Sequence, residues 1–412
     1  MTSLQADKTT IVHVRLVFLR IGEIDTLNEK YQAHAWIESR WIVPYDKLFS
    51  KISTVDQERL IHGRSIPLDK YDGSYWHPQL YIENALGDLK EQIKYSAKLN
   101  SKDHQIYICE HRIIKGLFWE KLELQHFPSD VQDLSISVTS MLFHNKVTLI
   151  PDLHHPSGVN REAFVDQQEW SLYEHIDTEQ RYINEFIFRI DHDDDDEDDE
   201  DYQQINDKNK EDRKRSVVTV TCHVARQSQY FFWNGFCLIF LITLVSFCAF
   251  GLPLQSIVNR LQVAATLLLT SISFRWTVNK SLPTISYLTT LDKYGILCIF
   301  NLVMHAIWHS IIAVIIYEQT PDFRVPKNSW IEHLDRGAFG VFFGLFVVLH
   351  IAMILWLFLV PYRHRKQMRQ KDEQYRTLML QKSKAADNHS FPAVQKKTVY
   401  DDSYTDRDFT KI

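Results

Sequence analysis

The chain has 412 residues, with 46 Lys and Arg against 52 Asp and Glu, which gives a net charge of −6 at pH 7. This length allows two domains, and the acidic balance gives no reason to expect a nucleic-acid partner. Only five cysteines are present and three of them fall in apolar segments, which excludes a disulfide framework and zinc sites of the usual Cys and His spacing. Residues 1–226 hold 27 Lys and Arg against 40 Asp and Glu, whereas residues 227–412 hold 19 against 12. An acidic soluble part is therefore expected to precede a basic part that contains the apolar segments.

Residues 1–228 are predicted to form a β-sandwich. Apolar and polar residues alternate in short runs bounded by turn residues, which is the period of half-buried strands. These runs are residues 11–21, 31–43, 106–114, 117–124, 134–142, 168–174 and 217–225. Residues 83–100 show little alternation and are expected to include a short helix. Many short strands with few helical periods are typical of a β-sandwich.

Residues 192–215 carry a block of like charges, HDDDDEDDEDYQQINDKNKEDRKR. Because this segment cannot bury apolar surface, we expect a disordered, solvated insertion between two strands. Weak Ca²⁺ binding by its carboxylates is the alternative. No other cofactor and no other metal site is predicted.

Four segments of the C-terminal half are long and apolar enough to cross a membrane. They are predicted at residues 230–250, 257–279, 293–317 and 337–361, within a membrane domain of residues 229–362. No charged residue stands between Arg226 and Arg260, so a buried soluble helix is a poor explanation of the first segment. We therefore expect a multi-pass protein in contact with a lipid bilayer, followed by a polar tail at residues 363–412.

The second of these segments carries a polar stripe. Its members recur at steps of three and four residues, about 3.6 on average, and therefore share one face of an α-helix. The stripe consists of Gln262, Thr266, Leu269, Ser273, Thr277 and Lys280. Hydroxyls and an amide facing lipid would be costly, whereas several copies around one axis would enclose a water-filled pore. Packing of this face inside a four-helix bundle is the alternative.

Three positions along this segment concern gating and ion selectivity. A ring of Leu269 side chains about mid-membrane could close a pore by dewetting. Asn259 stands beside Arg260 at one end, and Lys280 would place a positive ring at the other, a mild argument for anions. The sign of the permeant ion stays open.

Four motifs of the chain resemble those of the pentameric ligand-gated ion channels, the Cys-loop receptor superfamily. They are Trp76-His-Pro-Gln with Asn84-Ala85 downstream, Phe127-Pro128-Ser-Asp130-Val-Gln132, Arg226-QSQ-Tyr230-FFW-Asn234, and Ser281-Leu-Pro283-TISYLTTLDKY after the striped segment. They are similar to the family's WxPD…NA loop, its FPFDxQ turn, its pre-membrane RxxxYxxxN and the linker that follows its pore helix. The motifs fall in the family's order and cover roughly residues 11–362. Glu120 and Leu134 stand where the family's paired cysteines would be, so the chain resembles the Cys-less members.

The resemblance implies an extracellular β-sandwich, a four-helix membrane bundle and a homo- or heteropentamer. It also implies that Asp130 and Arg226 meet where the β domain joins the membrane helices, within a coupling region that includes Phe127 and Pro128. Such a pair could transmit a rotation of the sandwich to Pro283 and its linker. A purely structural ion pair is the alternative.

The resemblance also indicates where a small extracellular ligand would bind. In the family, an aromatic cage between subunits holds amine ligands through cation–π attraction. The corresponding positions fall at Trp36, at Tyr81 and Glu83, and near Met141 and Phe143. Most of the cage is missing, so an ordinary acetylcholine or GABA site is not expected.

We therefore expect a subunit of a ligand-gated ion channel of the plasma membrane, with its N-terminal domain outside the cell and inorganic ions as the permeant species. A non-conducting membrane receptor or assembly subunit of the same fold is the alternative, and no nucleophile–base pair suggests an enzyme. No signal peptide is visible, and the basic residues after Tyr362 favour a cytoplasmic tail by the positive-inside rule. The family's topology places that tail outside, and we adopt it.

Overall fold

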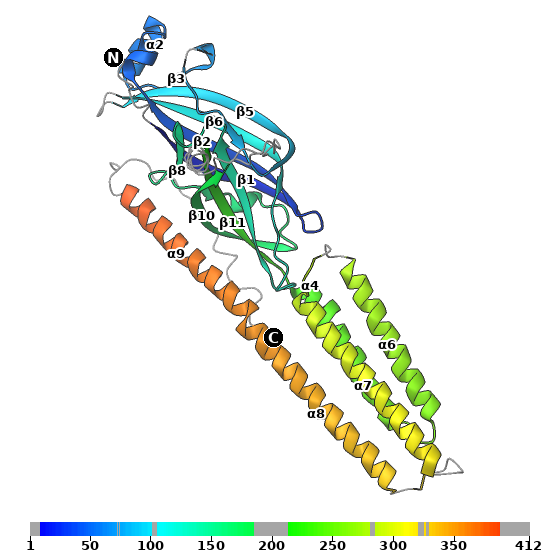
Figure 1. Ribbon diagram of the computed structural model, residues 1–412. Helices are drawn as coiled ribbons and strands as arrows, with labels where there is room; N and C mark the ends of the chain where they lie inside the picture. Colours follow the sequence, from blue (N-terminus) through cyan, green and yellow to red (C-terminus); the bar gives the residue numbers. More distant parts are fainter. Residues whose placement is uncertain are drawn as a thin grey trace, which may run out of the picture.

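The computed structural model describes residues 9–71, 73, 75–100, 105–184, 213–280, 285–319, 325–326 and 329–387. A β domain continues into a set of long helices, and the last helix returns along the side of the β domain (Figure 1). The two parts are joined where β11 ends at Arg226 and the first membrane helix begins at Gln229.

Two sheets form the β domain. The larger has the order β3-β5-β6-β2-β1-β8, with β9 also paired to β1, and the smaller has the order β10-β11-β7-β4. The strands of the larger sheet are β1 (Thr10–Asp25), β2 (Lys30–Val43), β3 (Ile66–Pro67), β5 (Ala85–Asn100), β6 (Gln105–Trp119), β8 (Val147–Pro151) and β9 (Gly158–Val159). Those of the smaller sheet are β4 (Leu80–Ile82), β7 (Val131–Ser140), β10 (Trp170–Asn184) and β11 (Lys214–Arg226).

The predicted alternation accounts for the core between the sheets. Along β2, for example, every second side chain from Tyr31 to Val43 is buried, while its neighbours face outward. These side chains form one apolar cluster with residues of the smaller sheet such as Ile136 and Val220. Burial of this kind is the main favourable contribution to folding. The expected sandwich-like architecture is present.

The expected short helix within residues 83–100 is wrong, because these residues form the long strand β5. Most of its side chains are exposed, and near its end only Ala97 and Leu99 are buried, so little apolar alternation is available to read. Pairing along nearly the whole of β6 fixes β5 instead. Two short helices, α1 (Tyr45–Phe49) and α2 (Thr54–Ile61), lie in the β2–β3 connection, where no helix was expected.

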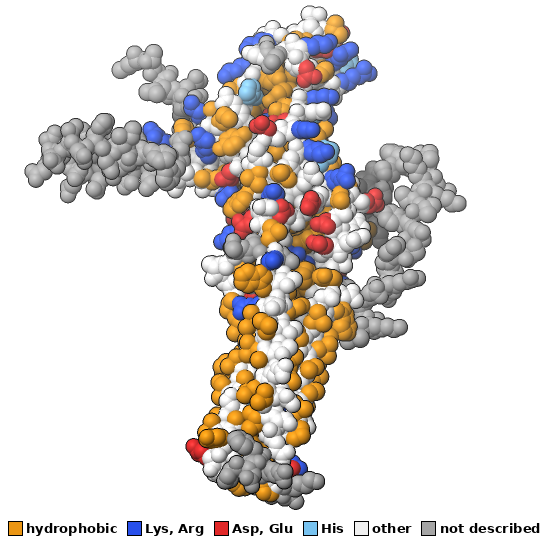
Figure 2. Space-filling view, turned by 90° about the vertical axis from the view of Figure 1, so that its right-hand side faces the viewer, with side chains coloured by type: hydrophobic (Ala, Val, Ile, Leu, Met, Phe, Trp, Pro, Cys, Tyr) orange, Lys and Arg blue, Asp and Glu red, His pale blue; other side chains and the backbone are white. Residues whose placement is uncertain are grey.

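Among the residues that the structure describes, four helices are long and apolar enough to cross a membrane. The first spans Gln229–Gly251 and is assembled from α4 (Gln229–Phe231), the π-helical η3 (Phe232–Cys237), α5 (Leu238–Val245) and the 3-10 turn η4 (Ser246–Gly251). The others are α6 (Ile257–Asn279), α7 (Thr290–Gln319) and α8 (Trp330–Leu359). Apolar side chains dominate this half of the surface (Figure 2). The arrangement is that of a multi-pass membrane protein.

The fourth helix begins seven residues before the predicted boundary at 337. Charged residues in its first two turns hide it from a hydropathy reading, but they are paired. Arg336 contacts Glu332 at 2.6 Å, and Asp335 is buried against Arg260 at 2.8 Å.

The polar tail contains a helix, α9 (Pro361–Asp387), which the sequence analysis did not predict. Pro361 is its first residue, a position where proline is favoured because the missing N–H has no intrahelical partner. Residues 192–212 of the acidic insertion and residues 281–284 with Pro283 lie outside the described residues. The expectations of disorder, Ca²⁺ binding and a coupling role for Pro283 therefore concern parts that are not described.

Candidate functional site

The polar stripe lies on the exposed face of α6. All seven predicted pore residues are exposed in the single chain: Asn259, Gln262, Thr266, Leu269, Ser273, Thr277 and Lys280. The buried residues of α6 are Arg260, Ala264 and Ser271, which face the other helices. The stripe therefore does not pack inside the chain's own helix bundle, as the alternative had it.

Hydrogen bonds within α6 satisfy some of the stripe's polar groups. The Thr266 hydroxyl donates to the Gln262 carbonyl at 2.8 Å, and the Thr277 hydroxyl donates to the Ser273 carbonyl at 3.1 Å. Such back-bonding lowers the cost of a hydroxyl in an apolar medium. The Gln262 amide and the Lys280 ammonium have no comparable partner among the described residues. These two groups need water or another molecule as a partner.

A buried ion pair that the sequence analysis missed anchors the start of α6. Arg260 is 2% exposed, and its guanidinium meets the Asp335 carboxylate of α8 at 2.8 Å. It also donates to the carbonyls of Phe250 and Leu252, and Asp335 accepts a further bond from the Trp308 indole at 3.1 Å. This network joins α6, α7, α8 and the turn after η4, and so fixes the rotation of α6 that leaves the stripe exposed.

Asp130 and Arg226 meet at the base of the β domain, as the resemblance implied. The Arg226 Nε lies 3.0 Å from the Asp130 Oδ1, and the two residues are 5% and 2% exposed. The Gln132 amide donates to the other carboxylate oxygen at 2.6 Å. The guanidinium also stacks over the rings of Trp170 and Phe127, at 4.2 and 5.2 Å. A buried pair with this many partners holds β7, β11 and the Phe127–Pro128 turn in one arrangement.

The same turn contacts the membrane helices directly. The Leu124 amide donates to the Tyr287 hydroxyl at 2.9 Å, and the Thr290 hydroxyl donates to the Gln125 carbonyl at 3.2 Å. The Phe127 ring packs edge-on against Phe231, with ring centroids 4.7 Å apart. The turn therefore contacts the first span, α7 and the segment that connects α6 to α7.

Glu120 and Ser135 close this turn without a disulfide. The Glu120 carboxylate accepts a bond from the Ser135 amide at 2.7 Å and another from its hydroxyl. Burial raises the pKa of Glu120, and the bonds from Ser135 oppose that shift. Glu120 and Leu134 stand at the positions that correspond to the paired cysteines of the resembling family. They lie at or beside this polar contact, which joins the two ends of the turn.

The helix α9 packs on β10 of the smaller sheet. Asp372 is 6% exposed, and one of its oxygens accepts bonds from the backbone amides of Glu174 and His175, at 2.6 and 3.0 Å. These amides lie where β10 bulges away from β11, between Leu172 and Ile176, and would otherwise lack partners. A cavity of about 410 Å³ separates the Phe127–Pro128 turn from the point where α8 meets α9.

Four of the five predicted ligand residues gather on the smaller sheet. The Arg215 guanidinium lies 5.6 Å above the Phe143 ring and donates to the Tyr81 hydroxyl at 3.3 Å. Glu83 forms an ion pair with Arg181 at 2.9 Å, and Met141 is exposed. The protein's own arginines thus occupy positions that would attract a ligand cation.

The fifth, Trp36, lies on the outer face of the larger sheet, so the fold of a single chain does not bring it to the other four. The Arg15 guanidinium lies 5.4 Å from its ring centroid, and the His111 ring stacks on it with centroids 6.0 Å apart. A comparison of the sequence with models of known protein families finds no match, and a comparison with curated proteins finds no significant relative.

Proposed function

We propose that the protein is a subunit of a pentameric ligand-gated ion channel, in which α6 lines the pore and the β domain receives an extracellular ligand. One observation carries this proposal: a membrane-length helix exposes a polar stripe, interrupted by Leu269, while its opposite face is fixed by a buried ion pair. A subunit with such a face would be unstable alone in lipid, and closed rotational symmetry is the usual way to bury identical faces.

The junction supports coupling between the two parts. Asp130, Arg226 and the neighbouring turn contact both β11 and the helices. A rotation of the sandwich would therefore move the segment that follows the C-terminal end of α6. In this proposal, ligand binding shifts a two-state equilibrium of that junction. The basic groups near Tyr81 and Glu83 favour a ligand with a carboxylate or another anionic group over a quaternary ammonium.

Cysteine accessibility tests the pore. Thr266→Cys and Ser273→Cys should react with a charged, membrane-impermeant thiol reagent and lose current. Ser271→Cys is the matched control, because Ser271 lies on the buried face of the same helix. The chain without added cysteines reports the background from exposed native thiols such as Cys248. Equal protection of all three positions, or a monomeric particle in detergent, would contradict the pore.

A non-conducting receptor or assembly subunit of the same fold is the second candidate, favoured by the incomplete aromatic cage. It predicts a pentamer whose Thr266 and Ser273 positions are accessible but which passes no current, even when Leu269→Thr weakens the proposed gate. Recording from the purified protein in planar bilayers distinguishes the two.

A further inference from the structure

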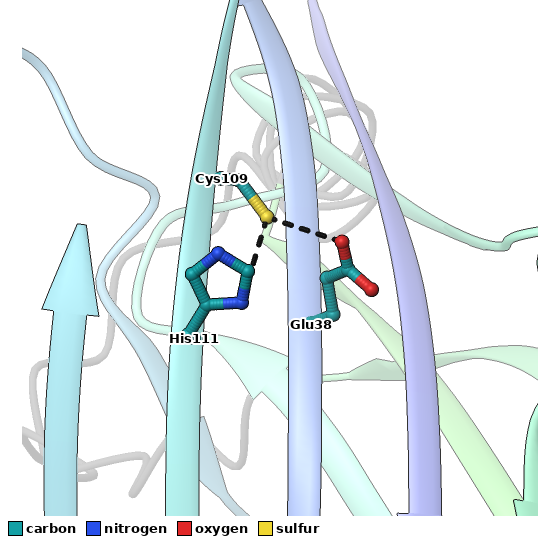
Figure 3. Close-up of side chains that lie close together, drawn as sticks. All are labelled: Glu38, Cys109 and His111. Atoms are coloured by element: carbon teal, nitrogen blue, oxygen red, sulfur yellow. Dashed lines mark hydrogen bonds between the residues drawn. The ribbon is translucent and has the colours of Figure 1, made fainter. Parts of the chain in front are cut away.

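A cluster of three metal-ligand side chains lies on the outer face of the larger sheet. Glu38 comes from β2, and Cys109 and His111 come from β6 (Figure 3). Glu38 and His111 are opposite each other in the strand register, and Cys109 lies two residues before His111 on the same face. All three side chains are partly buried, and their ligand atoms lie within 4.8 Å of one another.

The separations are close to those of a tetrahedral zinc site. The Cys109 sulfur is 3.4 Å from the Glu38 Oε1 and 4.0 Å from the His111 Nδ1. Zinc bonds of about 2.3 Å to sulfur and about 2.0–2.1 Å to nitrogen and oxygen imply ligand atoms roughly 3.3–3.6 Å apart. Of these two separations, only that between Cys109 and His111 exceeds this range, by about half an ångström, and the strand pairing already fixes the backbone.

The His111 ring is oriented for this role. Its Nε2 lies 3.2 Å from the Ser96 hydroxyl on β5, so the proton belongs on that nitrogen when the hydroxyl accepts it. The Nδ1 then carries the lone pair, and it is the nitrogen that faces Cys109. Metal-bound histidines are usually oriented by such a bond from their other nitrogen. Stacking on Trp36, with an angle of 12° between the rings, restricts the ring further.

Neighbouring charges allow a cation here. Two arginines approach Glu38, Arg15 at 3.6 Å and Arg40 at 3.8 Å, but each has a second partner. Arg40 pairs with the buried Asp152 carboxylate, and the Arg15 Nε donates to the Pro156 carbonyl at 3.1 Å. If Glu38 turns toward an ion, Arg40 keeps the Asp152 carboxylate as its charged partner, and Arg15 keeps the Pro156 carbonyl and the face of the Trp36 ring.

The sulfur of Cys109 selects the kind of metal. Thiolate and imidazole ligands suit Zn²⁺, whereas Ca²⁺ and Mg²⁺ prefer oxygen ligands.

We propose that Glu38, Cys109 and His111 bind one Zn²⁺ per subunit, with water in the fourth position. The site does not depend on ion conduction. If the proposed channel is correct, the ion would also hold Trp36 in place through the ligating His111 ring, and so influence ligand binding at that face.

The test uses the full chain in detergent, without a polyhistidine tag, and Co²⁺ as a spectroscopic probe for the zinc site. One equivalent of Co²⁺ per subunit should give a thiolate-to-cobalt charge-transfer band, which Zn²⁺ then abolishes. Cys109→Ser should remove the band, and Glu38→Gln and His111→Ala should weaken binding at least tenfold. Cys248→Ser and His34→Ala are the matched controls and should bind like the unchanged chain.

Proton release provides a second readout. Because a cysteine ligand binds metal as the thiolate, metal binding releases a proton and the apparent affinity should rise with pH. Absence of the band in the unchanged chain, or its retention in Cys109→Ser, would overturn the proposal. If Cys109→Ser fails to fold, equal affinities of Glu38→Gln, His111→Ala and the unchanged chain would overturn it as well. Each of these readouts is independent of current.

Discussion

Replacing Asp372 with Ala tests whether α9 is held to the β domain by one carboxylate. The substitution leaves two backbone donors without an acceptor, the buried amide of His175 and the partly buried amide of Glu174. An unsatisfied buried donor costs about 1–3 kcal/mol. Because the Glu174 amide is only partly buried, the two together should destabilise the docked position of α9 by about 2–4 kcal/mol. Since every 1.4 kcal/mol is about a factor of ten, local opening of α9 should become about 30- to 1,000-fold more frequent.

Hydrogen exchange measured by mass spectrometry reads this opening directly. Peptides from α9 and from the bulge of β10 should exchange faster in Asp372→Ala, while peptides from β2 and β6 should not change. Asp372→Asn keeps one acceptor oxygen and should give an intermediate effect. Glu373→Ala is the control, because Glu373 is the exposed neighbour on the same helix. Unchanged protection of α9 in Asp372→Ala would refute the reasoning.

The same contact should weaken in acid. Burial alone would raise the pKa of Asp372, but bonds from the His175 ring and from the two amides, together with Arg376, hold this pKa below its ordinary value of 3.8. A lowered pKa means that the stabilisation is fully present above pH 3.8 and is lost as the pH falls through the lower value of the docked state. Protection of α9 should therefore fall below about pH 4 in the unchanged chain, and the part of this loss due to Asp372 should be missing in Asp372→Asn.

Three further predictions concern the junction and the membrane helices. Leu269→Thr should raise the resting conductance of the proposed channel by wetting the gate; an unchanged resting current at normal surface expression would count against that gate. Reversing the charge of Asp130 or of Arg226 alone should cost about 3–5 kcal/mol by leaving a buried charge unpaired. The double reversal should recover part of this cost in thermal unfolding, and strictly additive losses would contradict the pairing. Arg260→Ala should lower the melting temperature more than the combined change with Asp335→Ala, and the reverse order would argue against a buried pair.

The sequence was sufficient where a local period decides the structure. Alternation identified β1, β2, β7 and β11, and a period of about 3.6 identified the exposed face of α6. It was insufficient where pairing with distant residues decides. The strand β5 has little alternation because most side chains on both of its faces are exposed, and its existence depends on β6.

The site residues that the sequence did not predict also depend on contacts with residues far away in the chain. Arg260 and Asp335 look like ordinary helix-end charges in sequence, and only the packing of α6 on α8 makes them a pair. The Cys-x-His spacing of Cys109 and His111 is too short for the zinc patterns considered, although two ligands two residues apart on a strand share a face. Glu38 lies 71 residues away from Cys109, and only strand pairing brings it into the cluster.

The contact between α9 and β10 has a topological consequence. An even number of crossings returns a polypeptide to the compartment from which it started, and four spans with a helix docked back on the β domain satisfy this parity. The basic residues Arg363 to Lys371 therefore share a compartment with the acidic sandwich, where Lys371 approaches Asp177 at 4.0 Å and Arg376 approaches Glu174 at 3.0 Å. A single reporter fused to either end of the protein would establish the orientation of the whole molecule.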